Sequence, residues 1–219
     1  MQMNPRGLRQ TGAAFAQAGA RLVVISLVLA AAASAESTSG RAHGRCEIQF
    51  FATTTKRDFS GSVAARPFLL TRHQDASGGP DWWSASVEVA VTHLLTGYDE
   101  RDRDMHWMFD AIDFPSIFAE FPHIASEAYE SERLDEAAPL EFRLTIRDVT
   151  RPMTAKVSHW VRNGDHASFD AEFDVSTSSF GLKVPTLLGF LRVGDIVTVR
   201  AHIELERPAV MQGRSNDSS

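Results

Sequence analysis

The feature that most restricts the fold is a period-two alternation of apolar and polar residues over much of the chain. In the clearest run, apolar and polar positions alternate from Val197 to Glu206. Successive side chains of a β-strand point to opposite faces, so such a run has one apolar and one polar face. Sheets with one buried and one solvated face are antiparallel, and the pattern therefore excludes a doubly wound α/β core.

The alternation predicts eight strands, which is enough to enclose one small ligand in a closed barrel. Eight apolar faces must be buried together, and either a barrel or a two-sheet sandwich achieves this. Composition does not choose between the two. In the sixth segment, His159 interrupts an apolar face that extends to Val161. The predicted strands are Cys46–Phe50, Phe59–Ala65, Ala85–Val91, Ile117–Phe121, Leu140–Ile146, Met153–Val161, Phe169–Val175 and Val197–Leu205.

Turn-forming residues separate these segments. Asn163-Gly164 lies between two alternating runs and predicts a hairpin, because both residues tolerate a positive φ. Gly78-Gly79-Pro80 predicts a second turn. Asp148–Pro152 is expected to separate two strands, since proline cannot continue a central ladder.

One segment changes from period two to a helical period. Met105, Met108, Phe109 and Ile112 are spaced i, i+3, i+4 and i+7 within the charged stretch Asp99–Asp113. This spacing predicts one amphipathic helix between strands, which ends before Pro115. A second, shorter helical turn is expected at Pro185–Leu191.

The first 35 residues have the pattern of a secretory signal peptide. Three arginines and no acidic residue precede the 12-residue apolar run Leu22–Ala33, and small residues follow up to Ala35. A membrane-spanning helix needs roughly 20 apolar residues, so cleavage after Ala35 and export to the periplasm are expected. The mature chain would then comprise a polar leader (36–45), a barrel domain (46–207) and a disordered tail (208–219).

The charge balance of the expected mature chain restricts its partners. Loss of Arg6, Arg9 and Arg21 leaves 19 basic residues against 28 acidic ones, a net charge of −9. This balance argues against a nucleic-acid partner and against an anionic membrane surface. No further apolar stretch predicts a membrane-spanning segment after cleavage. Cys46 has no intramolecular disulfide partner, which leaves a packed, inert thiol or an intermolecular bridge.

Three blocks of sequence resemble the YceI-like proteins, and they occur in that family's order. They are Met105–Phe109 with Phe114–Phe118, Leu144–Pro152, and Phe180–Leu182 with Val193–Val197. Asp148 departs from the pattern, because glycine is usual there. The resemblance implies an all-β fold: an extended, eight-stranded, antiparallel, lipocalin-like barrel. It also implies a long apolar cavity that binds polyisoprenoids or similar amphiphiles after export.

These features favour an exported binding or carrier protein that holds an isoprenoid-like ligand, such as a polyisoprenoid, a quinone or a lipid. The inward aliphatic and aromatic positions are the candidate lining residues, although each of them is also an ordinary core position. Methionine adapts to varied apolar shapes, so the helix is a candidate for a deformable wall. The candidates on strands are Phe50, Val87, Val89, Phe142, Leu144, Phe169, Phe173 and Val199, and those on the helix are Met105, Met108 and Phe109.

Motifs for catalysis or metal binding are missing from the sequence. The eight histidines show no HxH or HExxH spacing, and the serines at 176, 178 and 179 lack the glycines of a nucleophile elbow. We therefore expect no enzyme activity, metal or cofactor. Two alternatives stay open: a lipocalin-like enzyme that acts on an apolar substrate, and an interaction module whose barrel is filled by side chains. A homodimer through a strand edge or the helix is also open.

Overall fold

The computed structural model describes residues 40–74, 77–126, 139–183 and 193–207. The chain divides into two units, residues 1–36 and 37–219, and every described residue belongs to the second. The predicted signal peptide, the tail 208–219 and the turn Pro185–Leu191 lie outside the described residues. The strands are β1 Arg41–Thr54, β2 Phe59–Ala64, β3 Phe68–His73, β4 Trp82–Ala90, β5 Ser116–Ala125, β6 Pro139–Ile146, β7 Val149–Asn163, β8 His166–Ser176 and β9 Val193–Glu206; the helices are η2 Val91–His93, α1 Asp99–Met108 and η3 Ser178–Phe180.

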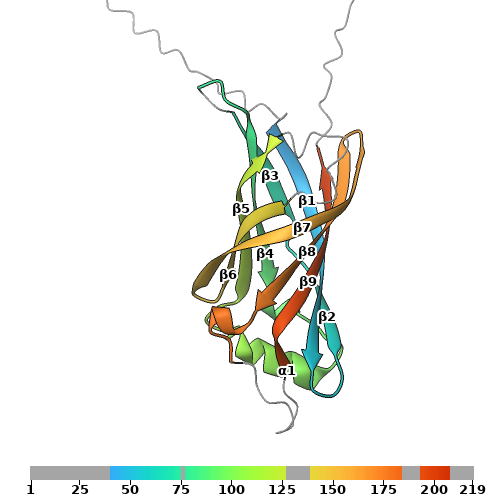
Figure 1. The fold of residues 1–219 in the computed structure, drawn as a ribbon, viewed down its shortest axis with the longest axis vertical. Helices are drawn as coiled ribbons and strands as arrows, with labels where there is room; N and C mark the ends of the chain where they lie inside the picture. Colours follow the sequence, from blue (N-terminus) through green and yellow to red (C-terminus); the bar gives the residue numbers. More distant parts are fainter. Residues whose placement is uncertain (1–39, 75–76, 127–138, 184–192, 208–219) are drawn as a thin grey trace, which may run out of the picture. The chain divides into compact units, whose positions relative to one another are not determined.

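The strands form one closed antiparallel sheet (Figure 1). Neighbouring strands follow the order β2-β1-β3-β4-β5-β6-β7-β8-β9, and β9 pairs with β1 as well as with β8. The closing ladder is long, because it extends from His43 opposite Glu206 to Thr54 opposite Val193. This closure answers the question that composition left open, and the fold is a barrel rather than a sandwich.

The barrel has eight strand positions although nine strands are labelled, since β2 and β3 share one position. Both pair with the same edge of β1: β2 with residues 47–52 and β3 with residues 41–44. Pro67 lies in the three-residue break between them, where its missing N–H interrupts the ladder. β3 is not among the predicted strands, because its first three residues are all apolar and do not alternate.

The barrel begins at Arg41, five residues before the predicted boundary, so part of the expected polar leader belongs to β1. The burial of side chains alternates from the start of this strand, but the inward residues are the small Ala42 and Gly44. A Cβ atom at Gly44 would overlap the ring of Phe68. The small inward residues therefore make room for β3. Because they are not large apolar residues, the sequence here lacks the apolar–polar alternation by which a strand is predicted.

Two-residue turns join β7 to its neighbours on both sides. Gly164–Asp165 connects β7 to β8, and Gly164 has a φ of 59°, which confirms the predicted hairpin. Asn163 itself lies in the ladder rather than in the turn. Arg147–Asp148 connects β6 to β7, and Arg147 takes the left-handed conformation with a φ of 55°.

The prediction that Asp148–Pro152 separates two strands is wrong for most of this segment, because β7 begins at Val149 and Pro152 lies inside it, opposite Arg143 of β6. The ladder between β7 and β8 begins only at Lys156, which pairs with Glu172. Among the described strands, the first half of β7 thus has a single neighbour. Proline is tolerated there, since an edge position needs no N–H for a second ladder.

A β-bulge at His159 reverses the faces of β7. His159 has a φ of 54°, and the pairing with β8 shifts by one residue between Ser158 and Val161. Trp160 consequently packs inward against Phe169, with 5.4 Å between the ring centroids, while Val161 is 59% exposed. The predicted apolar face of this strand therefore does not extend to Val161, and His159 lies on the outer face.

Helix α1 ends at Met108, so it does not include Ile112 as the predicted helix did. The N–H of Phe109 donates to the carbonyl of Met105, and Asp110 then takes a left-handed conformation with a φ of 54°. This turn redirects the chain, so Ile112 is 93% exposed instead of sharing the apolar face of the helix. None of the helices among the described residues is long and apolar enough to cross a membrane.

Candidate ligand cavity

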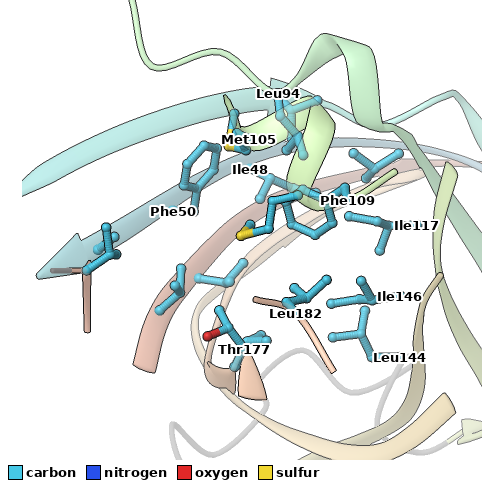
Figure 2. A pocket seen from close by; sticks show the side chains of 18 of the residues that line it. Ile48, Phe50, Leu94, Met105, Phe109, Ile117, Leu144, Ile146, Thr177 and Leu182 are labelled. Carbon is cyan, nitrogen blue, oxygen red and sulfur yellow. The ribbon is translucent and has the colours of Figure 1, made fainter. Parts of the chain in front are cut away.

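The interior of the barrel contains a cavity of about 200 Å³ beside α1, which we call the helix chamber (Figure 2). Its wall combines strands from most of the barrel with α1 and two short connections. The lining residues are Ile48, Phe50, Ala52, Phe59, Val63, Val87, Val89, Leu94, Arg101, Asp104, Met105, Met108, Phe109, Ile117, Ala119, Leu144, Ile146, Phe173, Val175, Thr177, Leu182, Val193, Val197 and Val199.

A second cavity, of about 160 Å³, is lined by strands alone and is called the strand chamber. The lining residues are Cys46, Ile48, Phe68, Leu70, Ala85, Val87, Ala119, Phe121, Ile124, Pro139, Leu140, Phe142, Ala155, Val157, Trp160, Phe169, Ala171, Phe173, Val199, Ala201, Ile203 and Leu205. Five of these residues also line the helix chamber, and we call this ring the waist: Ile48, Val87, Ala119, Phe173 and Val199. The two chambers therefore adjoin across side chains from five strands.

Aromatic contacts organise the strand chamber around Phe142. Its ring stacks on Phe121 with 5.2 Å between centroids, and it makes a T-shaped contact with Phe173 with 5.0 Å between centroids. Such pairs add about 0.5–1.5 kcal/mol each beyond the burial of their surface. Because β5, β6 and β8 each supply one of these rings, the contacts join three strands across the interior.

The methionines of α1 and the adjoining Phe109 form an apolar and adaptable part of the wall. Met105 and Phe109 point into the helix chamber together with Ile48 and Phe50 of β1 (Figure 2). Met108 lines the same chamber from the last residue of the helix. Methionine side chains are unbranched and rotate freely, so this wall can adjust to differently shaped apolar molecules.

Hydrogen bonds fix α1 to the preceding loop. The buried carboxylate of Asp102 accepts bonds from the backbone N–H and the hydroxyl of Thr96, at 2.7 and 2.5 Å. The Nε2 atom of His106 lies 3.1 Å from the carbonyl oxygen of Leu94. Leu95 is itself bonded to Ser62 of β2 through both backbone groups, so the helix is connected to the barrel wall.

Comparison with known proteins agrees with this architecture. The model of the YceI-like domain matches residues 34–205. The chain belongs to the YceI-like family. The sequences of curated proteins give no match.

Two solved structures share the fold of this YceI-like chain. A polyisoprenoid binding domain from Saccharophagus degradans, implicated in plant cell wall breakdown, is 14% identical, with a TM-score of 0.57 over 76% of this chain and 98% of that one. Burkholderia cenocepacia BcnA is 16% identical, with a TM-score of 0.54 over 73% and 95%. At these identities the likeness concerns the fold.

The structure places all eleven predicted site residues in the lining of the two chambers. Phe50, Val89, Met105, Met108, Phe109 and Leu144 line the helix chamber, Phe142 and Phe169 the strand chamber, and Val87, Phe173 and Val199 the waist. That these residues contact a ligand stays a prediction. The alternation contained the signal for other lining residues, such as Ile48 and Ile146. It could not identify Trp160, which lies beyond the bulge, or Leu94 and Leu182, which lie outside strands.

Polar atoms are rare in the lining, and the hydroxyl of Thr177 is already bonded. It donates to the carboxylate of Asp195 at 2.9 Å, and the Ser176 hydroxyl and the Ser178 N–H donate to the same group at 2.6 and 2.7 Å. These bonds, led by that from Ser176, lower the pKa of Asp195 to about 2. The cluster ties the end of β8 to the start of β9, so these serines have a structural role.

Cys46 points into the strand chamber and is buried. Burial raises the pKa of its thiol to about 12, and the adjacent charge of Glu47 contributes to the rise. A thiol with this pKa is almost entirely protonated at neutral pH and is therefore a poor nucleophile. The free, enclosed side chain fits the packed, inert thiol that was one of the two interpretations of the sequence.

The described residues contain no group of three or more His, Cys, Asp or Glu side chains arranged to hold a metal ion. His159 and His202 instead bond to the two oxygens of Asp170, at 2.9 and 2.7 Å, on the outer face of the barrel. The bonds to these histidines, His202 first, lower the pKa of Asp170. His159 is thus a hydrogen-bonded structural residue on the surface rather than in the core.

Proposed function

We propose that this YceI-like protein binds a long, flexible apolar molecule inside its barrel and acts as a binding or carrier protein. The observation that carries this proposal is the pair of adjoining chambers with an almost wholly hydrocarbon lining. We infer that the ligand is isoprenoid-like, which includes polyisoprenoids, quinones and other lipids with a long tail. The polyisoprenoid binding domain that shares the fold supports this class.

Burial of apolar surface supplies the free energy of binding. At ~25 cal/mol per Å², a tail that loses about 300 Å² of surface gains about 7 kcal/mol. The cost of association and of ordering the chain reduces this gain, so useful affinity requires most of the tail to be enclosed. Two chambers joined at a waist enclose a longer tail than either chamber alone, which favours an extended ligand.

The alternatives of an enzyme and of a filled barrel are less well supported. Active sites bring together several titratable groups with perturbed pKa values. Among the described residues, the titratable side chains that line the two chambers are Arg101, Asp104 and Cys46, and they do not lie in one cluster. Cys46 lies in the strand chamber, while the other two lie on α1. A module whose barrel is filled by side chains would lack cavities of this size.

We also propose that the protein is exported to the periplasm and that its mature form begins at Glu36. The basic lead, the short apolar run and the small residues before Glu36 support this proposal. Protein released by osmotic shock should give Glu36 as its N-terminal residue on sequencing. Retention of the Leu22–Ala33 segment in an integral-membrane fraction would contradict it.

Native mass spectrometry tests the binding function itself. The full chain is purified from membrane-containing cells without delipidation, and its mass is compared before and after extraction with organic solvent. We expect a discrete, extractable adduct of one lipid class, and we expect the extracted protein to take up geranylgeraniol. A protein that is free of adduct and does not take up geranylgeraniol would refute the proposal.

A further inference from the structure

Arg101 differs from every other described residue that lines the two chambers, because it is the one that carries a positive charge. It lies in the first turn of α1 and lines the helix chamber. Its guanidinium carbon is 4.3 Å from the ring centroid of Phe59 and 4.8 Å from that of Tyr98. The two rings hold the cation in place, since the face of an aromatic ring attracts a guanidinium group.

These contacts leave the hydrogen-bonding capacity of Arg101 unused. Within the described ranges, no ion pair or hydrogen bond joins the Arg101 side chain to another residue. Arginines elsewhere on the barrel do pair with carboxylates: Arg143 with Glu120 at 3.0 Å, and Arg200 with Glu172 at 2.6 Å. A guanidinium group has five N–H donors in a planar fork that matches a carboxylate or a phosphate.

We propose that Arg101 is the binding site for an anionic head group, a carboxylate or a phosphate, carried by the apolar chain that occupies the barrel. This inference rests on the proposed function and narrows it from an apolar molecule to an amphiphile with a defined orientation. The strand chamber has no charged side chain in its lining, so a charged head cannot be solvated there. The head therefore lies beside α1, and the tail extends through the waist.

Asp104, three residues further along α1, is the carboxylate residue that lines the same chamber. Its charge opposes the binding of an anion and weakens the attraction by Arg101. Asp102, between them, is turned away and is bonded to Thr96. The arrangement predicts opposite effects for the two lining residues: removal of the Arg101 charge weakens anion binding, and removal of the Asp104 charge strengthens it.

The test uses three probes with one hydrocarbon chain and different heads: geranylgeranyl phosphate, geranylgeranoate and geranylgeraniol. Dissociation constants are measured by calorimetry on the delipidated full chain, below the concentrations at which the probes aggregate. We expect the wild-type protein to bind at least one anion about tenfold more tightly than the neutral alcohol, since hydrogen bonds to a charged group are stronger than those between neutral groups. The phosphate and the carboxylate arms identify which anion is preferred.

Arg101→Gln should weaken binding of the preferred anion about tenfold and leave geranylgeraniol unchanged. Arg103→Gln is the matched control, because it removes the same charge from the same helix at a residue outside the lining. It should leave all three affinities within about twofold of wild type. Asp104→Asn should tighten binding of the anion and leave the alcohol unchanged. Binding of geranylgeraniol reports that each variant is folded.

Two results would overturn the head-group site. One is equal affinity of the wild-type protein for all three probes, with no effect of Arg101→Gln. The other is an equal loss of anion affinity in the Arg101 and Arg103 variants, which would indicate a general charge effect. Failure of the proposed function gives a different result, because then none of the three probes binds to the wild-type protein.

Discussion

The helix chamber and the strand chamber share the waist, but different kinds of structure form their walls. The strand chamber is enclosed by side chains of hydrogen-bonded strands, and aromatic contacts around Phe142 join three of these strands. One wall of the helix chamber is α1, whose methionines adapt in shape and whose attachment depends on Asp102 and His106. We therefore propose a division of roles: the strand chamber would hold the tail in a rigid space, while the helix chamber would adapt to the part of the ligand near the head.

The largest expected effect is on stability, through the rigid chamber. Phe142→Ala removes a buried ring that contacts Phe121 and Phe173, and we expect the free energy of unfolding to fall by about 3–5 kcal/mol. Chemical denaturation measures this loss. A loss below about 1 kcal/mol would mean that the strand chamber collapses around the missing ring and is not rigid.

The adaptable chamber should respond differently. Met105 and Met108 are half-buried, so replacing both with Ala should cost less stability than Phe142→Ala, about 2–3 kcal/mol in total. The widened chamber should weaken binding of geranylgeraniol about tenfold. Unfolding and ligand retention are measured on the same samples. A large loss of stability with unchanged retention would remove α1 from the binding site.

The matched control for this pair lies on the outer face of β9. Thr198 and His202 bond to Asp174 and Asp170 outside the barrel, and neither residue lines a chamber. Replacing both with Ala should leave retention unchanged and should lower the free energy of unfolding by less than about 1 kcal/mol. Loss of ligand in this control would mean that the faces of β9 are inverted.

The smallest expected effect is on thermal stability, through the hydrogen bonds of Asp195 that join the end of β8 to the start of β9 beside the helix chamber. The pKa of Asp195 is lowered to about 2 in the folded protein, so the hydrogen bonds of its ionised form stabilise the fold above the ordinary carboxyl pKa of about 4. This contribution is lost as the pH falls through 2. Asp195→Asn should lower the Tm at pH 7, and its difference from wild type should shrink near pH 2. A difference that grows as the pH falls would contradict the assignment.

The regular part of the fold was predictable, because the period-two alternation directly reflects one buried face per strand. It correctly predicted eight strand positions and the inward direction of residues such as Phe50, Phe142 and Val199. The failures have local backbone causes. The β-bulge at His159, where φ is positive, places one extra residue in β7 and reverses the faces of the strand beyond it. The left-handed conformation of Asp110 redirects the chain after α1, so Ile112 is exposed.

The site was predictable to the extent that it is apolar. Arg101 could not be identified from the sequence, because it lies in the run Asp99–Asp104, which has the composition of a solvated helix face. Its distinction comes from tertiary structure: Phe59, far away in the sequence, lies against its guanidinium group. Small inward residues such as Gly44 could not be predicted from the sequence for a similar reason. The ring of Phe68, on another strand, leaves no room for a side chain at Gly44.

The central claim is that a single chain passes through the waist and occupies both chambers. Ala119→Phe tests it most directly, because the small Ala119 side chain lines both chambers and a phenyl ring there would block a chain that runs from one to the other. Geraniol, farnesol and geranylgeraniol, each one isoprene unit longer than the last, are titrated into the wild-type and variant proteins. Binding of geraniol also reports that the variant is folded, since overpacking costs about 1–3 kcal/mol.

In the wild-type protein the dissociation constant should fall with each added isoprene unit, by about tenfold or more, since each buried methylene is worth ~0.8 kcal/mol. In Ala119→Phe, geraniol should bind as in the wild type, and the gain from farnesol to geranylgeraniol should disappear. If the variant keeps the full gain with chain length, or if the wild-type affinity no longer rises beyond geraniol, then the ligand occupies one chamber and the claim is wrong.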